Sequence, residues 1–259
     1  MKNAILAASL FASFATTIHL AHAEEGGKFS LETGMDYNTG KYGGTQSTDI
    51  LYVPVIGKYQ GKSWTLKLTV PYLRITGPAN VINIMNGVSV TGGANTPLTR
   101  SGLGDVILGA THNAYTSGAS GVMINLTGKV KFGTASSAKG LGTGKNDYAL
   151  QADLYKTTGS LTNFGTFGYK IYGSPIGYTL NNVFYGSLGV SYKFKPETNG
   201  GLVLALGQKT MATGSTHIEM LFFVNHKLDK NWKAQGYMLK GFTNGVPDLG
   251  AGASIVYLF

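Results

Sequence analysis

The sequence predicts an all-β fold, a transmembrane antiparallel up-and-down β-barrel of about twelve strands, within a range of roughly ten to fourteen. Three observations predict it. Apolar and polar residues alternate with a period of two along most of the chain, charged side chains keep to one of the two resulting faces, and the last alternating segment ends on Phe259. Charged residues are only 13% of the chain, and no stretch after residue 23 reaches the ~20 apolar residues that a membrane-spanning helix needs.

The first 23 residues have the pattern of a cleavable secretory signal. Lys2 precedes an uncharged apolar run over residues 4–18, and Ala21-His22-Ala23 has the small-x-small spacing that signal peptidase recognises. This run is too short for a membrane-spanning helix. We therefore expect residues 1–23 to be a signal peptide and residues 24–259 to form the barrel, which would lie in a bacterial outer membrane.

Composition and charge argue against several other classes of protein. The chain has no Cys, so we expect neither disulfides nor a thiolate metal site, and we expect no cofactor. Its net charge of +9 comes from Lys residues spread singly along the chain, without the basic block typical of nucleic-acid binding. The expected partners are outer-membrane lipid, the barrel-assembly machinery and a small-molecule solute, and not nucleic acid.

The alternation is clearest over residues 121–133. Val122, Ile124 and Leu126 fall on one face there, whereas Lys129 and Lys131 fall on the other. The same pattern predicts strands at 28–38, 49–60, 63–75, 103–115, 121–133, 147–157, 161–172, 182–195, 201–210, 216–227, 231–242 and 249–259. The prediction is weakest for 231–242, whose apolar residues do not settle on one parity.

The connections between these strands alternate between short turns and longer loops, as expected for periplasmic turns and outer loops. The longest loop, 76–102, contains the apolar stretch 81–85. This loop is a candidate for a constriction folded into the barrel. It could equally pack over the barrel mouth or extend a strand.

The two faces tolerate charge differently. A Lys or Arg that faces lipid at mid-membrane depth costs roughly 2–4 kcal/mol, whereas a lumen accommodates paired charges among small polar residues. Arg74 and Lys156 have outward parity only at strand ends, where long side chains can reach the interface. The inward face collects the predicted lumen-lining residues: Glu32, Asp36, Lys67, Lys129, Lys131, Asp153, Lys170, Lys193 and Glu219, with Lys58 and Asp105 beside them.

Aromatic residues lie near both ends of the predicted strands, as in the interfacial girdles of membrane barrels. Trp64 and Trp232 lie beside predicted periplasmic turns. The last strand is apolar at every second position and carries Ile255, Tyr257 and the terminal Phe259. We expect these three residues to be the signal that the barrel-assembly machinery recognises.

Several segments resemble the outer-membrane proteins grouped as the "phenol meta-degradation pathway" transporter family. They are Val70-Pro71-Tyr72 with Gly77-Pro78, Gly102-Leu103-Gly104-Asp105-Val106, Gly142-Thr143-Gly144 with Tyr148-Ala149-Leu150, and the aromatic C-terminus. This resemblance implies a role in moving small hydrophobic or aromatic compounds across the outer membrane. It transfers no set of binding residues.

We accordingly expect a channel for passive uptake of small, hydrophobic or aromatic compounds, and not an enzyme. Joint replacement of Lys129 and Lys131 by Glu should then reverse the ion preference of the pore. One alternative is a lipid-modifying enzyme, for which Ser215, His217 and Glu219 are the candidate residues. A second alternative is a plugged, structural or adhesin-like barrel, which would pass no solute.

Overall fold

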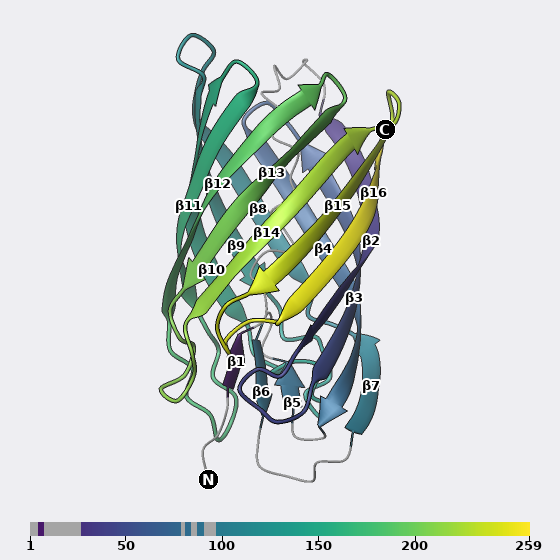
Figure 1. Ribbon diagram of the computed structural model, residues 1–259, viewed down its shortest axis with the longest axis vertical. Helices are drawn as coiled ribbons and strands as arrows, with labels where there is room; N and C mark the ends of the chain where they lie inside the picture. Colours follow the sequence, from purple (N-terminus) through teal and green to yellow (C-terminus); the bar gives the residue numbers. More distant parts are fainter. Residues whose placement is uncertain (1–4, 8–26, 79–80, 84–86, 91–96) are drawn as a thin grey trace.

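A computed structural model describes residues 5–7, 27–78, 81–83, 87–90 and 97–259. No helix in these ranges is long and apolar enough to cross a membrane. The described secondary structure is β throughout (Figure 1). The main sheet contains β2 (Lys28–Gly40), β3 (Thr48–Gln60), β4 (Trp64–Pro78), β7 (Pro97–Leu103), β8 (Ile107–Ser117), β9 (Val122–Lys131), β10 (Asp147–Thr158), β11 (Leu161–Ile171), β12 (Val183–Lys195), β13 (Thr198–Gly207), β14 (His217–Lys227), β15 (Trp232–Gly241) and β16 (Leu249–Leu258).

Twelve of these strands, β2 to β4 and β8 to β16, form a closed barrel. Sequential barrel strands pair antiparallel, β4 pairs with β8, and β16 pairs with β2, so the cylinder has no free edge. Closure satisfies the backbone hydrogen bonds that a bilayer cannot satisfy. All twelve predicted strands are confirmed, and so is the up-and-down antiparallel barrel.

The predicted strand 231–242 is confirmed as β15. Its apolar residues occupy both odd and even positions, and this pattern has a structural cause. Tyr237 and Leu239 point into the barrel, while Met238 between them is exposed on the outside. The interior of this wall is itself apolar, so both faces of β15 carry apolar residues.

The predicted start of the strand 103–115 is wrong. Pairing with β4 begins earlier, at Pro97, and is interrupted before β8 begins at Ile107. Leu103 lies opposite Tyr72, and Ile107 lies opposite Thr69. The four residues that lead from Leu103 to Ile107 therefore span the same length as three residues of β4. This extra residue is a β-bulge, which turns Asp105 into the buried interior.

The predicted loop 76–102 is correspondingly shorter, because β4 continues to Pro78 and β7 begins at Pro97. Two short strands, β5 (Val81–Asn83) and β6 (Gly87–Val90), pair within it, and β1 (Ile5–Ala7) pairs with β6. Residues 79–80, 84–86 and 91–96 lie outside the described residues, as does most of the predicted signal peptide. The predicted constriction therefore stays a prediction.

The barrel has a turn end and a loop end. The turn end carries the short connections 61–63, 118–121, 159–160, 196–197 and 228–231, together with the C-terminus (Figure 1). The loop end carries the longer connections 41–47, 132–146, 172–182, 208–216 and 242–248. This division agrees with the predicted alternation of periplasmic turns and outer loops.

The outer surface is apolar between two aromatic bands. Mid-barrel leucines are open to the outside, with Leu188 68% exposed. At the turn end, ring contacts join Phe29 to Tyr59, Trp64 to His112, Tyr192 to Phe194, and Trp232 to Tyr257, which also contacts Phe259. An apolar belt bordered by aromatic rings is the exterior that a bilayer requires, so this is a transmembrane barrel of the outer-membrane type.

One turn gives a sharp stability test. Gly121 has a φ of +66°, and its carbonyl accepts a 2.8 Å hydrogen bond from the amide of Thr157. A Cβ at residue 121 would clash with the carbonyl oxygen of Thr157. We expect Gly121→Ala to lower the free energy of unfolding by about 1–3 kcal/mol. The measurement is urea unfolding in lipid vesicles, followed by tryptophan fluorescence.

Gly118→Ala is the matched control, because a Cβ at residue 118 would have no atom within 4 Å. It should unfold like the wild-type protein. Equal stability of the two variants would contradict the proposed role of Gly121.

Candidate solute pathway

A row of lysines winds along the inner wall of the barrel. Cross-strand register places Lys58 opposite Lys67, Lys67 opposite Gly109, Gly109 opposite Lys129, Lys129 opposite Ala149, and Ala149 opposite Lys170. Lys58 lies near the turn end of β3, and Lys170 lies next to the last residue of β11, at the loop end. The row therefore climbs from one end of the barrel to the other, because the strands tilt.

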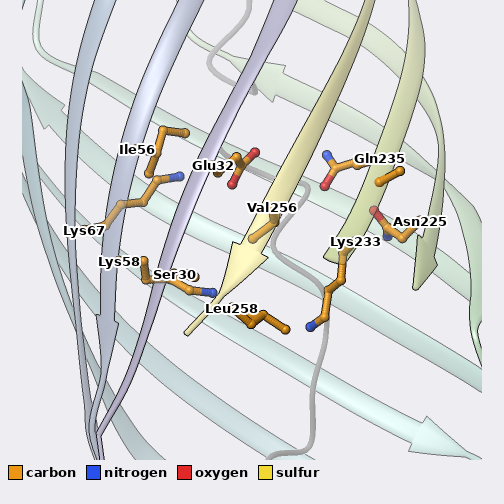
Figure 2. A pocket seen from close by; sticks show the side chains of 11 residues that line it. Ser30, Glu32, Ile56, Lys58, Lys67, Asn225, Lys233, Gln235, Val256 and Leu258 are labelled. Atoms are coloured by element: carbon orange, nitrogen blue, oxygen red, sulfur yellow. The ribbon is translucent and has the colours of Figure 1, made fainter. Parts of the chain in front are cut away.

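The turn-end part of this row lines a pocket, which we call the basic pocket (Figure 2). Its charged residues are Lys58, Lys67, Lys233 and Glu32. The other lining residues are Ser30, Asn225, Gln235, Ile56, Ala234, Val256 and Leu258. Three lysines against one glutamate give this end of the pathway an excess of positive charge.

The middle of the row is tied into a hydrogen-bond network. The Nζ of Lys129 donates to Oε1 of Gln151 at 2.8 Å, and Nε2 of Gln151 donates to Oδ1 of Asp153 at 2.9 Å. Thr166 donates to the same Asp153 oxygen at 2.6 Å, and the hydroxyl of Tyr185 donates to Gln151 at 3.0 Å. Asp153 is thus buried but hydrogen-bonded, as a buried carboxylate must be.

At the loop end, the row finishes in a buried ion-pair cluster of two lysines and two aspartates. The Nζ of Lys131 lies 3.0 Å from Oδ2 of Asp105 and 3.2 Å from Oδ2 of Asp147. The Nζ of Lys170 lies 3.8 Å from the same Asp147 oxygen. All four side chains are buried and their formal charges cancel.

Two segments that carry the family resemblance meet at this cluster. Asp105 comes from the bulge after Gly104, and its Oδ1 accepts a 2.9 Å hydrogen bond from the amide of Ala135. The segment beginning at Gly142 passes next to the carboxylate of Asp105, since a Cβ at residue 142 would lie 3.0 Å from its Oδ2. The two motifs therefore fasten the loop 132–146 to the barrel wall.

An apolar patch faces the interior on the opposite wall. It consists of Val203, Ala205, Leu221, Phe223 and Leu239, with Phe164 and Tyr237 packed against it. The hydroxyl of Tyr237 donates a 2.8 Å hydrogen bond to Asp36 across β16, which places both side chains inside the barrel. This patch could contact the nonpolar part of a passing solute.

At the loop end, loop residues pack against the ends of the barrel strands. Tyr42, Ile75 and Leu141 form a buried apolar cluster there, and Val246 is fully buried. Tyr42 has a φ of 54°, unusual for a residue with a side chain, and is held by this packing. Burial raises the pKa of the Tyr42 hydroxyl, and the nearby carboxylate of Asp248 raises it further. The tyrosine therefore remains neutral.

The structure places the predicted lumen residues in five different environments. Lys67 lies in the basic pocket with Glu32, and Ser254 donates a 3.0 Å hydrogen bond to Glu32. Lys193 lies at the turn end and is exposed. The remaining ones are in the hydrogen-bond network, the ion-pair cluster or beside the apolar patch: Asp36, Lys129, Lys131, Asp153, Lys170 and Glu219.

The expectation that Lys131 helps to set the ion preference is revised. Its side chain is only 2% exposed and is held between two aspartates, so a solute does not meet its charge. Replacement by Glu would act on the stability of the cluster instead. Lys233, Asp147 and the apolar patch are the components that the sequence did not reveal. In 217–227, apolar residues occupy both odd and even positions, and this pattern could have predicted the patch.

A family model described as "Putative MetA-pathway of phenol degradation" matches residues 23–259. No curated protein sequence matches the chain. Among solved structures, the KdgM porin aligns with a TM-score of 0.55 at 12% identity, covering 88% of this chain and 98% of that one. The NanC porin aligns with a TM-score of 0.52 at 13% identity and the same two coverages. These likenesses concern the fold.

Proposed function

Because this chain belongs to the MetA-pathway phenol-degradation family, we propose that it is a passive channel for small aromatic compounds in the outer membrane. The observation that carries the proposal is the mixed chemistry of the inner wall. An apolar patch lies on one side, and lysines and hydrogen-bonding groups lie on the other. An aromatic compound with one polar substituent could contact both.

The proposed mechanism is diffusion. Solute would enter past the loops, slide along the apolar patch and leave at the turn end, driven only by its concentration gradient. Selectivity would follow from the width of the lumen and from the field of its charged side chains.

The direct test is transport by the purified, reconstituted protein. We expect a measurable conductance in planar bilayers and stopped-flow efflux from liposomes of tyrosine, an aromatic zwitterion that crosses lipid slowly. A trisaccharide such as raffinose should stay inside because the lumen also holds large side chains. Heat-dependent gel mobility verifies that the barrel is folded. Absence of both conductance and efflux in folded protein would contradict the channel and favour the plugged structural barrel.

The enzyme alternative has one structural feature to consider. The Nε2 of His217 lies 3.4 Å from Oε1 of Glu219, and both side chains are buried. Residues 217 and 219 share the inward face of β14, on the same side as the apolar patch. A hydrolase acting on membrane lipid would need these groups on the lipid side of the wall. The solved structures reported above are porins, which agrees with a channel.

A further inference from the structure

We propose that the basic pocket is a binding site for the carboxylate of a small aromatic acid, placed where the solute leaves the channel. This inference rests on the proposed channel function and specifies its substrate class. It starts from Lys58 and Lys67, which lie directly opposite each other on β3 and β4 and both line the pocket.

Two lysines in this arrangement repel each other. Among the described residues, neither has a carboxylate within 4.0 Å of its Nζ, in contrast to Lys131 and Lys170 nearer the loop end of the barrel. Both residues have intermediate exposure, so part of each one is accessible to solvent and to solute. An anion between them would replace repulsion with two attractive contacts.

Two further charged residues line the pocket. Lys233 contributes a third ammonium group, and Glu32 is the one acidic lining residue. Glu32 already accepts the hydrogen bond from Ser254. Figure 2 shows the three lysines gathered around Glu32 and the end of β16. Lys58, Lys67 and Glu32 together carry a formal charge of +1, which suits a monoanion better than a neutral solute.

The pocket also has an apolar side. Ile56, Val256 and Leu258 line it beside the lysines. A small inorganic anion would leave these side chains without a partner, whereas the ring of an aromatic acid would cover them. The combination therefore selects an organic carboxylate over chloride or phosphate.

The position of the pocket explains why such a site would help transport. It lies at the turn end, which is the predicted periplasmic end, and follows the apolar patch along the pathway. Partly solvated lysines bind a carboxylate weakly. A weak site at the exit would draw the acid through the lumen and still release it.

The test is block of the potassium chloride current through single reconstituted channels. Benzoate is the probe, and benzamide, of the same shape but uncharged, is its control. We expect benzoate to reduce the current saturably and benzamide to have no effect at the same concentration. Lys58→Gln with Lys67→Gln should raise the half-blocking concentration of benzoate about tenfold. Lys58→Arg with Lys67→Arg should keep it within about twofold, since both charges remain.

The matched control removes the same charge from the same end of the barrel. Lys62 and Lys230 are exposed in two of the turns there, so Lys62→Gln with Lys230→Gln should leave the block unchanged. If Lys58→Gln with Lys67→Gln does not fold, Lys67→Gln alone should raise the half-blocking concentration about threefold.

Equal block by benzoate and benzamide, or unchanged block after removal of both pocket lysines, would overturn the site and leave the channel standing. No current through folded wild-type protein would overturn the channel and the site together.

Discussion

Replacement of Lys131 by methionine is expected to destabilise the barrel by about 3–5 kcal/mol, because it leaves buried carboxylates without their main partner. Lys131 lies within 3.2 Å of carboxylate oxygens of both Asp105 and Asp147. Methionine keeps most of the length of the side chain but not its charge. Lys170, 3.8 Å from Asp147, is then the one cation left in the cluster. Urea unfolding in lipid vesicles measures the loss.

The control for this variant is Lys139→Met, which removes an exposed lysine from the same loop. A surface change of this kind should alter stability by less than about 0.5 kcal/mol. Addition of Asp105→Asn to Lys131→Met should recover most of the loss, because the remaining Asp147 and Lys170 balance each other. Simple additivity of the two substitutions would contradict the direct contact between them.

The cluster also joins the loop end to the barrel wall. Lys131 ends β9 and Asp147 begins β10, so they bracket the loop 132–146. Asp105 holds this loop through the amide of Ala135. Disruption of the ion-pair cluster should therefore loosen the loop before the barrel unfolds. Protease cleavage near Lys139 would reveal this loosening.

The strands could be predicted because each one meets two different environments. Lipid outside and a polar interior impose alternation on every strand, and Val122 to Phe132 shows it plainly. Where the interior is apolar, alternation fades, as it does at Leu239 in β15. The strand was still found, but the inward direction of Lys233 was not.

The candidate site was less predictable because it depends on register. Alternation tells whether a lysine points inward, but not which residue it faces. Lys129 and Lys131 look equivalent in the sequence. In the barrel, Lys129 donates to the amide oxygen of Gln151, whereas Lys131 is enclosed between two aspartates. The bulge that delivers Asp105 was visible only as a glycine-rich motif.

Charge on the outer surface is expected to be nearly as damaging as loss of the cluster. Leu188 lies near the middle of β12, with Gly165 and Leu204 as cross-strand neighbours, and is 68% exposed. Leu188→Arg should lower the free energy of unfolding in lipid vesicles by about 2–4 kcal/mol, because the arginine must enter hydrocarbon. Urea titration in vesicles of fixed composition measures this.

Leu228→Arg is the matched control. Leu228 is a comparably exposed leucine, at 57%, but lies in the turn between β14 and β15. Water or lipid headgroups surround an arginine there, so its cost should fall to about 0–1 kcal/mol. The difference in unfolding free energy between the two variants shows whether lipid or water surrounds the outer wall. In a water-soluble β-sheet protein, an arginine on an exposed mid-strand position is harmless, and both variants would then unfold alike. A large cost at Leu188 alone requires that the apolar belt is solvated by lipid.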